Sequence, residues 1–405
     1  MTAESTSSLR LRISQKVETI LRGGHPWLFS DSIREQNRTG TIGELAIIYD
    51  RKNRFLGMGL FDPDGPIRVR MLHTGKPQKV DRAWWQQHLT TTLNRRRSLF
   101  DSRTNGYRLC NGESDGWPGL VLDRYDSTLV LKIYTTVWLS RLNEIVELIA
   151  EQVSHERLIL RLSRNIQDKA LPFTEGQILR GLAPVESVVF LESGIRFEVD
   201  PVRGQKTGFY LDQRENRRIV ESLSAGRRVL NAFSFSGGFS LYAARGGAVS
   251  VTDLDISPHA LASSDRNFAL NLDDPTIHRC RHESVKTDVF DWLASPVVSP
   301  QSFDLIILDP PSLARRESER EQAIRAYGRL ASSAIKLLAP KGILVACSCS
   351  AHVSTPEFLE AIRNAGAQSG RTFTELQTTG HAADHPATFP EANYLKAIYL
   401  GLSAT

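Results

Sequence analysis

The sequence predicts an α/β fold in which a doubly wound parallel sheet occupies the C-terminal half, preceded by a β-rich unit and a small α+β unit. From Arg228 onward, strand-like runs alternate with helical segments, which is the pattern of a parallel sheet covered by helices on both faces. Nearer the N-terminus, short apolar runs are broken by Gly and Asp-Pro turns, as in small β-rich domains. A chain of 405 residues is long enough for two or three domains.

The β-rich unit is expected to span residues 1–75, and a segment before its strands carries aromatic residues. This segment, Gly23-Gly-His-Pro-Trp-Leu-Phe29, places Trp27 and Phe29 just after a turn. The strand-like runs of the unit are Leu45–Tyr49, Phe55–Leu60 and Ile67–Met71.

The α+β unit is expected to span residues 76–185. Within residues 81–100, Trp85, Leu89 and Leu93 recur at helical spacing, and a second helix is predicted around Ser140–Val153. Arg95–Arg97 close the first helix. These arginines either contact phosphates or simply end a solvated helix, where cations interact favourably with the helix macrodipole. A boundary near residue 185 leads into a C-terminal domain of residues 186–405.

Composition excludes several classes of protein. Hydrophobic residues make up 41% and charged residues 23% of the chain, as in ordinary globular proteins, and a net charge of +5 permits contact with phosphates without establishing it. The N-terminus lacks the apolar run of a secretory signal, and no stretch reaches the roughly 20 apolar residues of a membrane span. Four scattered cysteines fit neither a disulfide framework nor a zinc site. We therefore expect a cytoplasmic protein with no metal and no membrane partner.

The segment from Arg228 to Leu241 predicts a buried strand, a tight turn at Gly237-Gly238 and a helix. Glycines in such a turn let a ligand approach the backbone, whereas the alternative is a plain turn and helix start. The second strand ends on Asp255, about 20 residues later, a spacing that suits a carboxylate binding both hydroxyls of a ribose.

The turn lacks the Gly-x-Gly-x-x-Gly pattern that holds a pyrophosphate, so a ligand with a ribose but no phosphate fits better. S-adenosylmethionine is such a ligand. Asp288 falls where the end of a third strand would supply a contact to the adenine.

The fourth strand ends at Asp309-Pro-Pro311, on the edge of the sheet where ligands of open α/β folds bind. Two prolines fix φ and stiffen the loop. Methyltransferases that act on exocyclic amines of bases often carry an aromatic residue after such a pair, whereas Ser312 and Leu313 follow here. The difference favours a target other than an amine.

Two cysteines, Cys347 and Cys349, end the fifth strand. A thiolate that adds to carbon 6 of a pyrimidine makes carbon 5 nucleophilic, and after methylation a base removes the carbon-5 proton so that the thiol leaves. Strand alternation puts both cysteines on one side, so periodicity does not separate them, but Cys349 is nearer the loop. The alternative is that both are small buried core residues.

These motifs resemble those of the bacterial 23S rRNA cytosine-5 methyltransferases that carry an N-terminal PUA domain, and the similarity covers nearly the whole chain. Within it, Gln205-Lys-Thr-Gly-Phe209 is the most specific stretch. The segments that carry the resemblance are Gly24–Ser30, Gly204–Arg214, Asn231–Gly238, Asp309–Pro311 and Ser348–Ser350.

The resemblance implies a PUA fold for residues 1–75, an RNA-binding α+β domain for 76–185 and a Rossmann-like, S-adenosylmethionine-dependent methyltransferase domain for 186–405. It implies that Cys349 is the nucleophile and that Asp309 is a second catalytic residue, which orients the target base. The implied cofactor-binding residues are Asn231, Phe233, Ser236, Gly237, Gly238, Asp255, Asp288 and Asp309.

The resemblance also implies that the partner is 23S rRNA in the precursor of the large subunit, with Arg95–Arg97, Arg161 and Arg164 meeting phosphates. Trp27 and Phe29 would stack on bases, and packing inside the β-rich unit is the alternative for at least one of them. No DNA partner is expected, and the oligomeric state, a homodimer included, stays open. Cytosine C5 methylation is the leading hypothesis for function. The alternatives are methylation of a base amine or of uridine C5, and an RNA-binding assembly factor without turnover.

The base that removes the carbon-5 proton is not assigned by the sequence. Related uridine-5 methyltransferases carry a glutamate a few residues after a Phe-Pro pair, whereas Phe389-Pro390 is followed at about that offset by Lys396. Asp384, His385 and Glu391 are the candidates, and hydrogen bonding within a loop is their alternative role.

Overall fold

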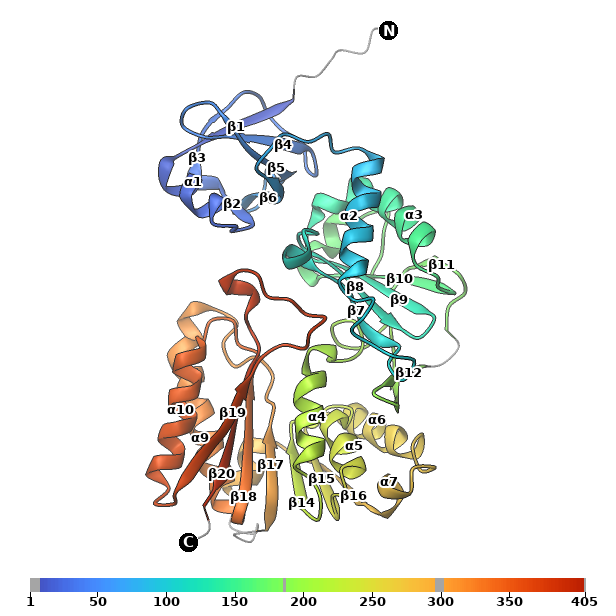
Figure 1. Cartoon of the computed structure of the whole chain (residues 1–405), viewed down its shortest axis with the longest axis vertical. Helices are drawn as coiled ribbons and strands as arrows, with labels where there is room; N and C mark the ends of the chain where they lie inside the picture. Colours follow the sequence, from blue (N-terminus) through green and yellow to red (C-terminus); the bar gives the residue numbers. More distant parts are fainter. Residues whose placement is uncertain (1–7, 185–186, 296–301, 404–405) are drawn as a thin grey trace. The chain divides into compact units, whose positions relative to one another are not determined.

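The computed structural model describes residues 8–184, 187–295 and 302–403, and the chain forms two compact units (Figure 1). The first unit holds the described parts of residues 1–190 together with 199–209 and 384–389. The second holds the described parts of 191–198, 210–383 and 390–405. The predicted boundary near residue 185 lies outside the described residues, and the division into three domains stays a prediction.

The N-terminal strands of the first unit form a mixed sheet of order β2-β6-β5-β4-β1-β3. Alternate residues of β1 point into an apolar core, which also receives Leu21 from helix α1 (Gln15–Arg22). The predicted β-rich unit is therefore confirmed. The strands are β1 (Leu9–Ile13), β2 (Trp27–Phe29), β3 (Ile33–Gln36), β4 (Leu45–Tyr49), β5 (Phe55–Phe61) and β6 (Ile67–Thr74).

A second sheet of the first unit has the order β11-β10-β9-β8-β7. Helices α2 (Arg82–Asn94) and α3 (Leu142–Gln152) share one core with it, in which Trp85, Trp117 and Trp138 are almost fully buried. The strands are β7 (Gly106–Asn111), β8 (Leu120–Tyr125), β9 (Thr128–Ile133), β10 (Arg157–Leu162) and β11 (Ile178–Arg180). A separate two-stranded sheet pairs β12 (Val188–Glu192) with β13 (Ile195–Val199).

The second unit is built on a seven-stranded sheet of order β16-β15-β14-β17-β18-β20-β19. Strands β14 to β18 run parallel, and the central residues of β14, β17 and β18 are buried, as expected for strands covered on both faces. The strands are β14 (Arg228–Ala232), β15 (Ser250–Asp255), β16 (Arg281–Lys286), β17 (Phe303–Leu308), β18 (Leu338–Ser348), β19 (Phe373–Thr379) and β20 (Lys396–Leu402).

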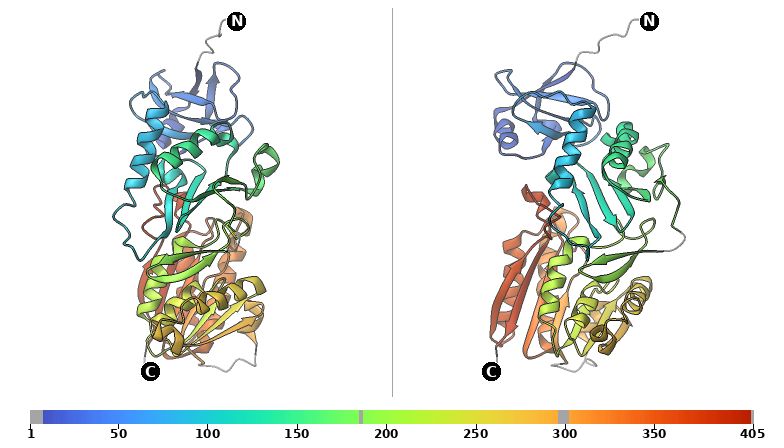
Figure 2. Two further views of the ribbon diagram at one scale, coloured as in Figure 1. Left: turned by 90° about the vertical axis from the view of Figure 1, so that its right-hand side faces the viewer. Right: turned by 45° about the vertical axis from the view of Figure 1, so that its right-hand side comes forward.

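Helices cover both faces of this sheet (Figures 1 and 2). Helices α9 and α10 lie on one face and α4, α5 and α6 on the other, so the predicted doubly wound arrangement is confirmed. The helices are α4 (Arg214–Ser222), α5 (Gly238–Arg245), α6 (Pro258–Ala269), α7 (Pro275–Arg279), α8 (Val289–Ala294), α9 (Arg320–Leu337) and α10 (Thr355–Gln368). No helix in the described parts of the chain is long and apolar enough to cross a membrane.

The order of the strands reverses beside β14. The chain proceeds from β14 to β15 and β16 on one side, and then to β17 and β18 on the other. Ligands of open α/β sheets bind at the carboxyl ends of the strands at such a switch point. The loops that leave β14 and β17 carry the residues predicted to bind the cofactor and the base.

A buried carboxylate stabilises the second unit. Glu192 is fully buried and accepts two hydrogen bonds of 2.8 Å from the guanidinium of Arg217, and its carboxylate lies 3.2 Å from Nε of Arg214. The Tyr242 hydroxyl donates to the same carboxylate at 3.1 Å. Because both arginines are also buried, removal of the carboxylate leaves two cations without their counter-ion.

We predict that Glu192→Ala lowers the free energy of unfolding by about 3–5 kcal/mol, the usual loss when one partner of a buried ion pair is removed. Glu215→Ala is the matched control, because Glu215 forms a half-exposed pair with Arg218, and such pairs contribute at most about 1 kcal/mol. Urea denaturation followed by circular dichroism measures both. Equal losses in the two variants would contradict the assignment of Glu192 as a structural counter-ion.

Candidate active site

The loop after β14 has a strained backbone. Phe233, Phe235 and Gly237 have φ values of 63°, 49° and 74°, in a region that non-glycine residues rarely occupy. Asp255 holds this loop, because its Oδ2 accepts the N–H of Phe235 at 2.9 Å and its Oδ1 accepts that of Ser257 at 2.8 Å. Each carboxylate oxygen keeps a second lone pair, which is what a ribose hydroxyl requires.

A second carboxylate, Asp253, lies fully buried on β15 behind the same loop. It accepts hydrogen bonds from the hydroxyls of Ser240 and Ser264 and from Asn231 Nδ2, and His282 Nε2 lies 2.9 Å from it. Sequence reasoning missed Asp253, because a carboxylate in mid-strand has no motif of its own. Asn231, a predicted cofactor residue, is fully buried here and supports the loop from within.

Three buried oxygen atoms near the loop have no hydrogen-bond partner among the described residues: Asn231 Oδ1, Ser234 Oγ and Ser236 Oγ. Unsatisfied buried polar atoms are rare in folded proteins and mark places where a ligand or water completes the bonding. S-adenosylmethionine offers amino and hydroxyl donors, so these residues fit it. Gly237 caps helix α5 and Gly238 is its first residue, so both predicted glycines lie in this cradle.

Asp288 follows β16 and caps helix α8. Its Oδ1 accepts the N–H of Phe290 at 2.8 Å and that of Asp291 at 3.3 Å. The ring of Phe290 meets that of Phe233 edge to face, with 6.1 Å between the ring centres. The structure thus brings the loops of Phe233 and Asp288 together at the carboxyl ends of β14 and β16.

Asp309 is the first residue after β17, and its Oδ1 accepts a hydrogen bond of 3.0 Å from Gln213 Nε2. Gln213 is held in turn by Asn216, whose Nδ2 donates to Gln213 Oε1 at 2.5 Å. Sequence reasoning gave Gln213 no role, although it lies within the Gly204–Arg214 segment. This residue fixes the orientation of the Asp309 carboxylate.

Burial separates the two cysteines that alternation left equivalent. Cys347 lies within β18 with only 1% of its surface exposed, and burial raises the pKa of its thiol well above the usual value. Cys349 lies one residue beyond the strand and is half-buried, with its Sγ 3.9 Å from the carbonyl oxygen of Pro310. Only Cys349 therefore combines access with a place beside the Asp309 loop.

The two serines that flank Cys349 anchor it. Ser350 Oγ accepts the N–H groups of Leu313 and Ala314 at 3.0 and 3.2 Å, which ties the loop after β18 to the loop after β17. Tyr327 on α9 bonds to the hydroxyls of both Ser348 and Ser350, at 2.9 and 2.8 Å. Burial raises the pKa of Tyr327 to about 12, so its hydroxyl stays protonated near neutral pH.

Lys396, the first residue of β20, pairs with Ser348 of β18, and only 3% of its surface is exposed. Its ammonium donates to the carbonyl oxygens of Ser350 and Val353, at 2.7 and 2.5 Å. Burial lowers the pKa of Lys396 to about 8. The lysine at the offset expected for a glutamate base thus holds the chain that follows Cys349.

The three candidates for the proton-abstracting base have different surroundings. Asp384 is fully buried in the first unit, where its Oδ2 accepts the N–H of Arg108 at 2.8 Å and its Oδ1 lies 3.0 Å from Nδ1 of His385. His385 is 2% exposed. Glu391 belongs to the second unit and is exposed.

Two of the predicted phosphate contacts in the first unit are wrong. Arg96 is buried and donates to both oxygens of Asp115, and Arg161 is buried and donates to Glu175 and to the carbonyls of Pro201 and Gly204. Both arginines form ion pairs inside the protein, and their partners, Asp115 and Glu175, cannot be predicted from the spacing of the arginines. The exposed arginines of the same segments are Arg95, Arg97 and Arg164, of which Arg95 also pairs with Asp115.

The two aromatic residues near the N-terminus differ in exposure. Phe29 exposes 41% of its surface, whereas Trp27 is half-buried and its indole N–H donates to Glu113 at 2.9 Å. The ring of Trp27 also meets that of Phe389 edge to face at 5.2 Å. Phe29 is thus the more accessible of the two for stacking.

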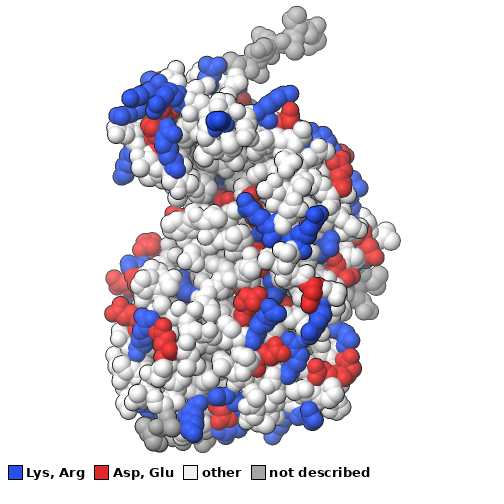
Figure 3. Space-filling view, in the orientation of Figure 1, with Lys and Arg blue, Asp and Glu red and all other residues white. Residues whose placement is uncertain are grey.

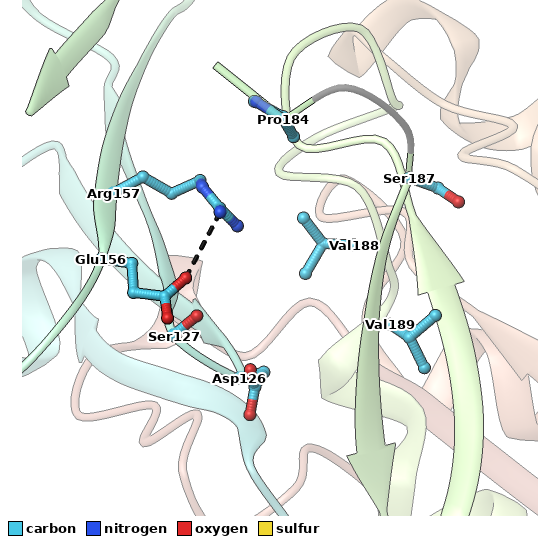
Figure 4. A pocket seen from close by; sticks show the side chains of 8 residues that line it. All are labelled: Asp126, Ser127, Glu156, Arg157, Pro184, Ser187, Val188 and Val189. Atoms are coloured by element: carbon cyan, nitrogen blue, oxygen red, sulfur yellow. Dashed lines mark hydrogen bonds and ion pairs between the residues drawn. The ribbon is translucent and has the colours of Figure 1, made fainter. Parts of the chain in front are cut away.

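A polar hollow of about 340 Å³ lies elsewhere in the first unit (Figure 4). Arg157 and Glu156 form an ion pair of 3.3 Å on one wall, and Val188 and Val189 lie on the other. None of the residues predicted to bind the cofactor or the base lines it, so we assign it no part in the site.

Comparison with known proteins assigns two parts of the chain to known families. The sequence model of the S-adenosylmethionine-dependent methyltransferase family matches residues 140–399, and that of the PUA-like domain matches residues 11–74. A ribosomal RNA large subunit methyltransferase of Deinococcus radiodurans is 56% identical over 405 residues, covering 98% of each chain. Ribosomal RNA large subunit methyltransferase I of Shewanella denitrificans is 34% identical, covering 96% of this chain and 98% of its own.

A crystal structure described as a putative methyltransferase complexed with SAH has the same fold. Its TM-score is 0.83 at 24% identity, and the match covers 97% of this chain and 100% of that one. The predicted PUA-like and Rossmann-like folds are confirmed by these matches.

We predict that Gly237→Ala abolishes S-adenosylmethionine binding, because an added Cβ would lie 2.1 Å from Ser264 Oγ at a residue with φ of +74°. Gly226→Ala is the matched control. It has φ of +71° but no atom within 4 Å of the added Cβ, so it carries the backbone strain, about 1 kcal/mol, without the clash. Isothermal titration calorimetry with the cofactor compares the two, and normal binding by Gly237→Ala would refute the close approach of loop and helix α6.

Proposed function

Because the chain belongs to the S-adenosylmethionine-dependent ribosomal RNA large subunit methyltransferases, we propose that it methylates carbon 5 of a cytosine in 23S rRNA. The cofactor is S-adenosylmethionine. We further propose that the enzyme acts in the cytoplasm, where four scattered cysteines suit a reducing compartment.

The observation that carries the choice of reaction is the position of Cys349. It is accessible, it follows a strand of the switch-point sheet, and its sulfur lies 3.9 Å from the Pro310 carbonyl of the Asp309-Pro-Pro311 loop. A merely structural cysteine belongs inside the sheet, as Cys347 does. A transferase that methylated a base amine would need no thiol at this point.

The reaction requires a nucleophile, a group that binds the base and a proton acceptor from the chain. The Cys349 thiolate adds to carbon 6 of the ring, which makes carbon 5 nucleophilic. S-adenosylmethionine supplies an electrophilic methyl group to that carbon. Asp309, oriented by Gln213, binds the polar edge of the base, and a proton acceptor of the chain then removes the carbon-5 proton so that the thiolate leaves.

The cofactor contacts follow from the strained loop. Asp255 binds the ribose hydroxyls, Asp288 faces the adenine end, and Ser234 and Ser236 use the hydroxyls that lack partners in the described protein. Gly237 and Gly238 keep side chains out of the cradle, and Phe233 packs beside Phe290 at its rim. We assign Asn231 a supporting role, since its side chain is fully buried.

RNA binding is proposed for the first unit. Arg10 and Arg34 are exposed on β1 and β3, whereas Arg12 pairs with Glu35 and Arg38 with Glu44. Figure 3 shows Lys and Arg side chains gathered over this part of the six-stranded sheet. Such a group of cations suits the phosphates of structured RNA, and Phe29 adds an exposed ring for stacking.

The test of the reaction is incubation with labelled S-adenosylmethionine and unmodified 23S rRNA, followed by nucleoside analysis. We predict 5-methylcytidine with the natural protein, at least a hundredfold less with Cys349→Ala because the covalent step is lost, and near-normal product with Cys347→Ala. An N-methylated base would show that the enzyme methylates a base amine, and 5-methyluridine would show that it methylates uridine C5; either product would contradict the proposal. Transfer to no RNA would favour an assembly factor.

Trapping adds a second readout. Fluorine at carbon 5 cannot leave as a proton does, so RNA containing 5-fluorocytidine should form an adduct with the protein that survives denaturing electrophoresis. We expect the adduct with Cys347→Ala and none with Cys349→Ala. An adduct that persists in Cys349→Ala would reject this cysteine as the nucleophile even if methylation itself is confirmed.

A further inference from the structure

We propose that Lys396 is a positioning residue whose buried ammonium stabilises the thiolate of Cys349 and holds the loop that carries it. The inference rests on the proposed role of Cys349, and it adds a residue of a different element, β20, to the site. Lys396 is not a catalytic residue in this proposal, because it acts through the cysteine.

The buried ammonium of Lys396 has incomplete hydrogen bonding. Lys396 exposes 3% of its surface, and its ammonium has three N–H groups. Two of them donate to the carbonyls of Ser350 and Val353. Within residues 8–184, 187–295 and 302–403, the third has no acceptor and the ammonium has no carboxylate within ion-pair distance. A buried ammonium without a counter-ion is unfavourable, so a negative charge nearby would stabilise it.

Three titratable groups near Lys396 differ in whether they can carry a negative charge beside it. Burial lowers the pKa of Lys396, and negative charge on Cys349 or Glu357 would raise it. Glu357 on α10 is already engaged, since it bonds to Arg320 and to the hydroxyl of Ser354. Tyr327 on α9 stays neutral near pH 7. Of these three groups, Cys349 is the one that remains to supply a negative charge.

Hydrogen bonds hold the chain on both sides of Cys349. Ser350 follows Cys349 directly, and its backbone oxygen accepts from Lys396 while its hydroxyl is fixed by Tyr327 and the loop after β17. Cys349 thus lies between Ser348 and Ser350, which are both held by hydrogen bonds, and Lys396 donates to the carbonyl of the residue that follows it. A cation fixed near a thiol lowers the free energy of the thiolate, whose proton passes to solvent.

The test is the pH dependence of Cys349 alkylation by iodoacetamide in the full-length protein, followed by mass spectrometry of the Cys349 peptide. No RNA is needed. We predict that Lys396→Gln, which keeps a hydrogen-bond donor but removes the charge, raises the pH of half-maximal alkylation by about one unit, equal to a tenfold smaller thiolate fraction below that pH. Lys396→Arg, which restores a cation, should return the midpoint toward that of the natural protein.

Lys336→Gln is the matched control, because Lys336 is exposed on α9 of the same unit and should leave the midpoint unchanged. The midpoint, and not the absolute rate, is the readout, since a shift in loop exposure alone would change the rate at every pH. Unchanged midpoints in Lys396→Gln, with cofactor binding intact, would overturn the proposal.

The reciprocal measurement covers the case in which Lys396→Gln does not fold. In protein labelled with ¹³C at lysine Cε, Cys349→Ala should lower the titration midpoint of Lys396, because the thiolate that favours the ammonium is gone. An identical Lys396 titration with and without the thiol would reject the coupling. Both measurements are independent of methyl transfer, so failure of the proposed reaction and failure of this inference give different results.

Discussion

The loops that leave β17 and β18 are tied together by one buried hydroxyl, and the candidate site depends on this tie. The parallel ladder between the two strands ends at Leu308 and Ala346, whereas Asp309 and Cys349 lie beyond it. Past this ladder the two chains no longer pair with each other, although Ser348 still pairs with β20 and the N–H of Asp309 donates to the Ala232 carbonyl. Ser350 Oγ restores the constraint by accepting two N–H groups of the loop after β17. The tie therefore keeps Cys349 beside the Asp309-Pro-Pro311 loop, as both proposed roles require.

The loop after β14 is fixed by a different means. Left-handed conformations at Phe233 and Phe235 are costly, and they persist only where the surroundings hold them. Asp255 supplies that hold from the end of β15, while Asp253 anchors the strand and helix beneath. The same strain turns the loop so that hydroxyls without protein partners remain in it. Backbone strain and unsatisfied oxygens thus coincide at the place where a nucleoside cofactor is expected to bind.

The sequence predicted the parallel strands and the segments of the site because both follow from local patterns: apolar runs, glycine turns and carboxylates after strands. It did not predict β19 and β20, since antiparallel pairing at a sheet edge depends on contacts distant in sequence. For the same reason Arg96 was misread, because its partner Asp115 comes from another element. Spacing also left Cys347 and Cys349 equivalent, and only their burial distinguishes them.

Lys396 bears on the unassigned proton acceptor as well. Its amine donates to two carbonyl oxygens, and the neutral form, which has two N–H groups, could keep both bonds while it offered a lone pair to a proton. The two roles need opposite charge states, because a cation is required to stabilise the Cys349 thiolate before it adds to carbon 6, whereas only the neutral amine accepts the carbon-5 proton. If Lys396 holds its charge as proposed, the position that holds a glutamate base in related uridine-5 methyltransferases serves a different purpose here. The proposal then requires an acceptor from another residue, such as a carboxylate or imidazole outside β20.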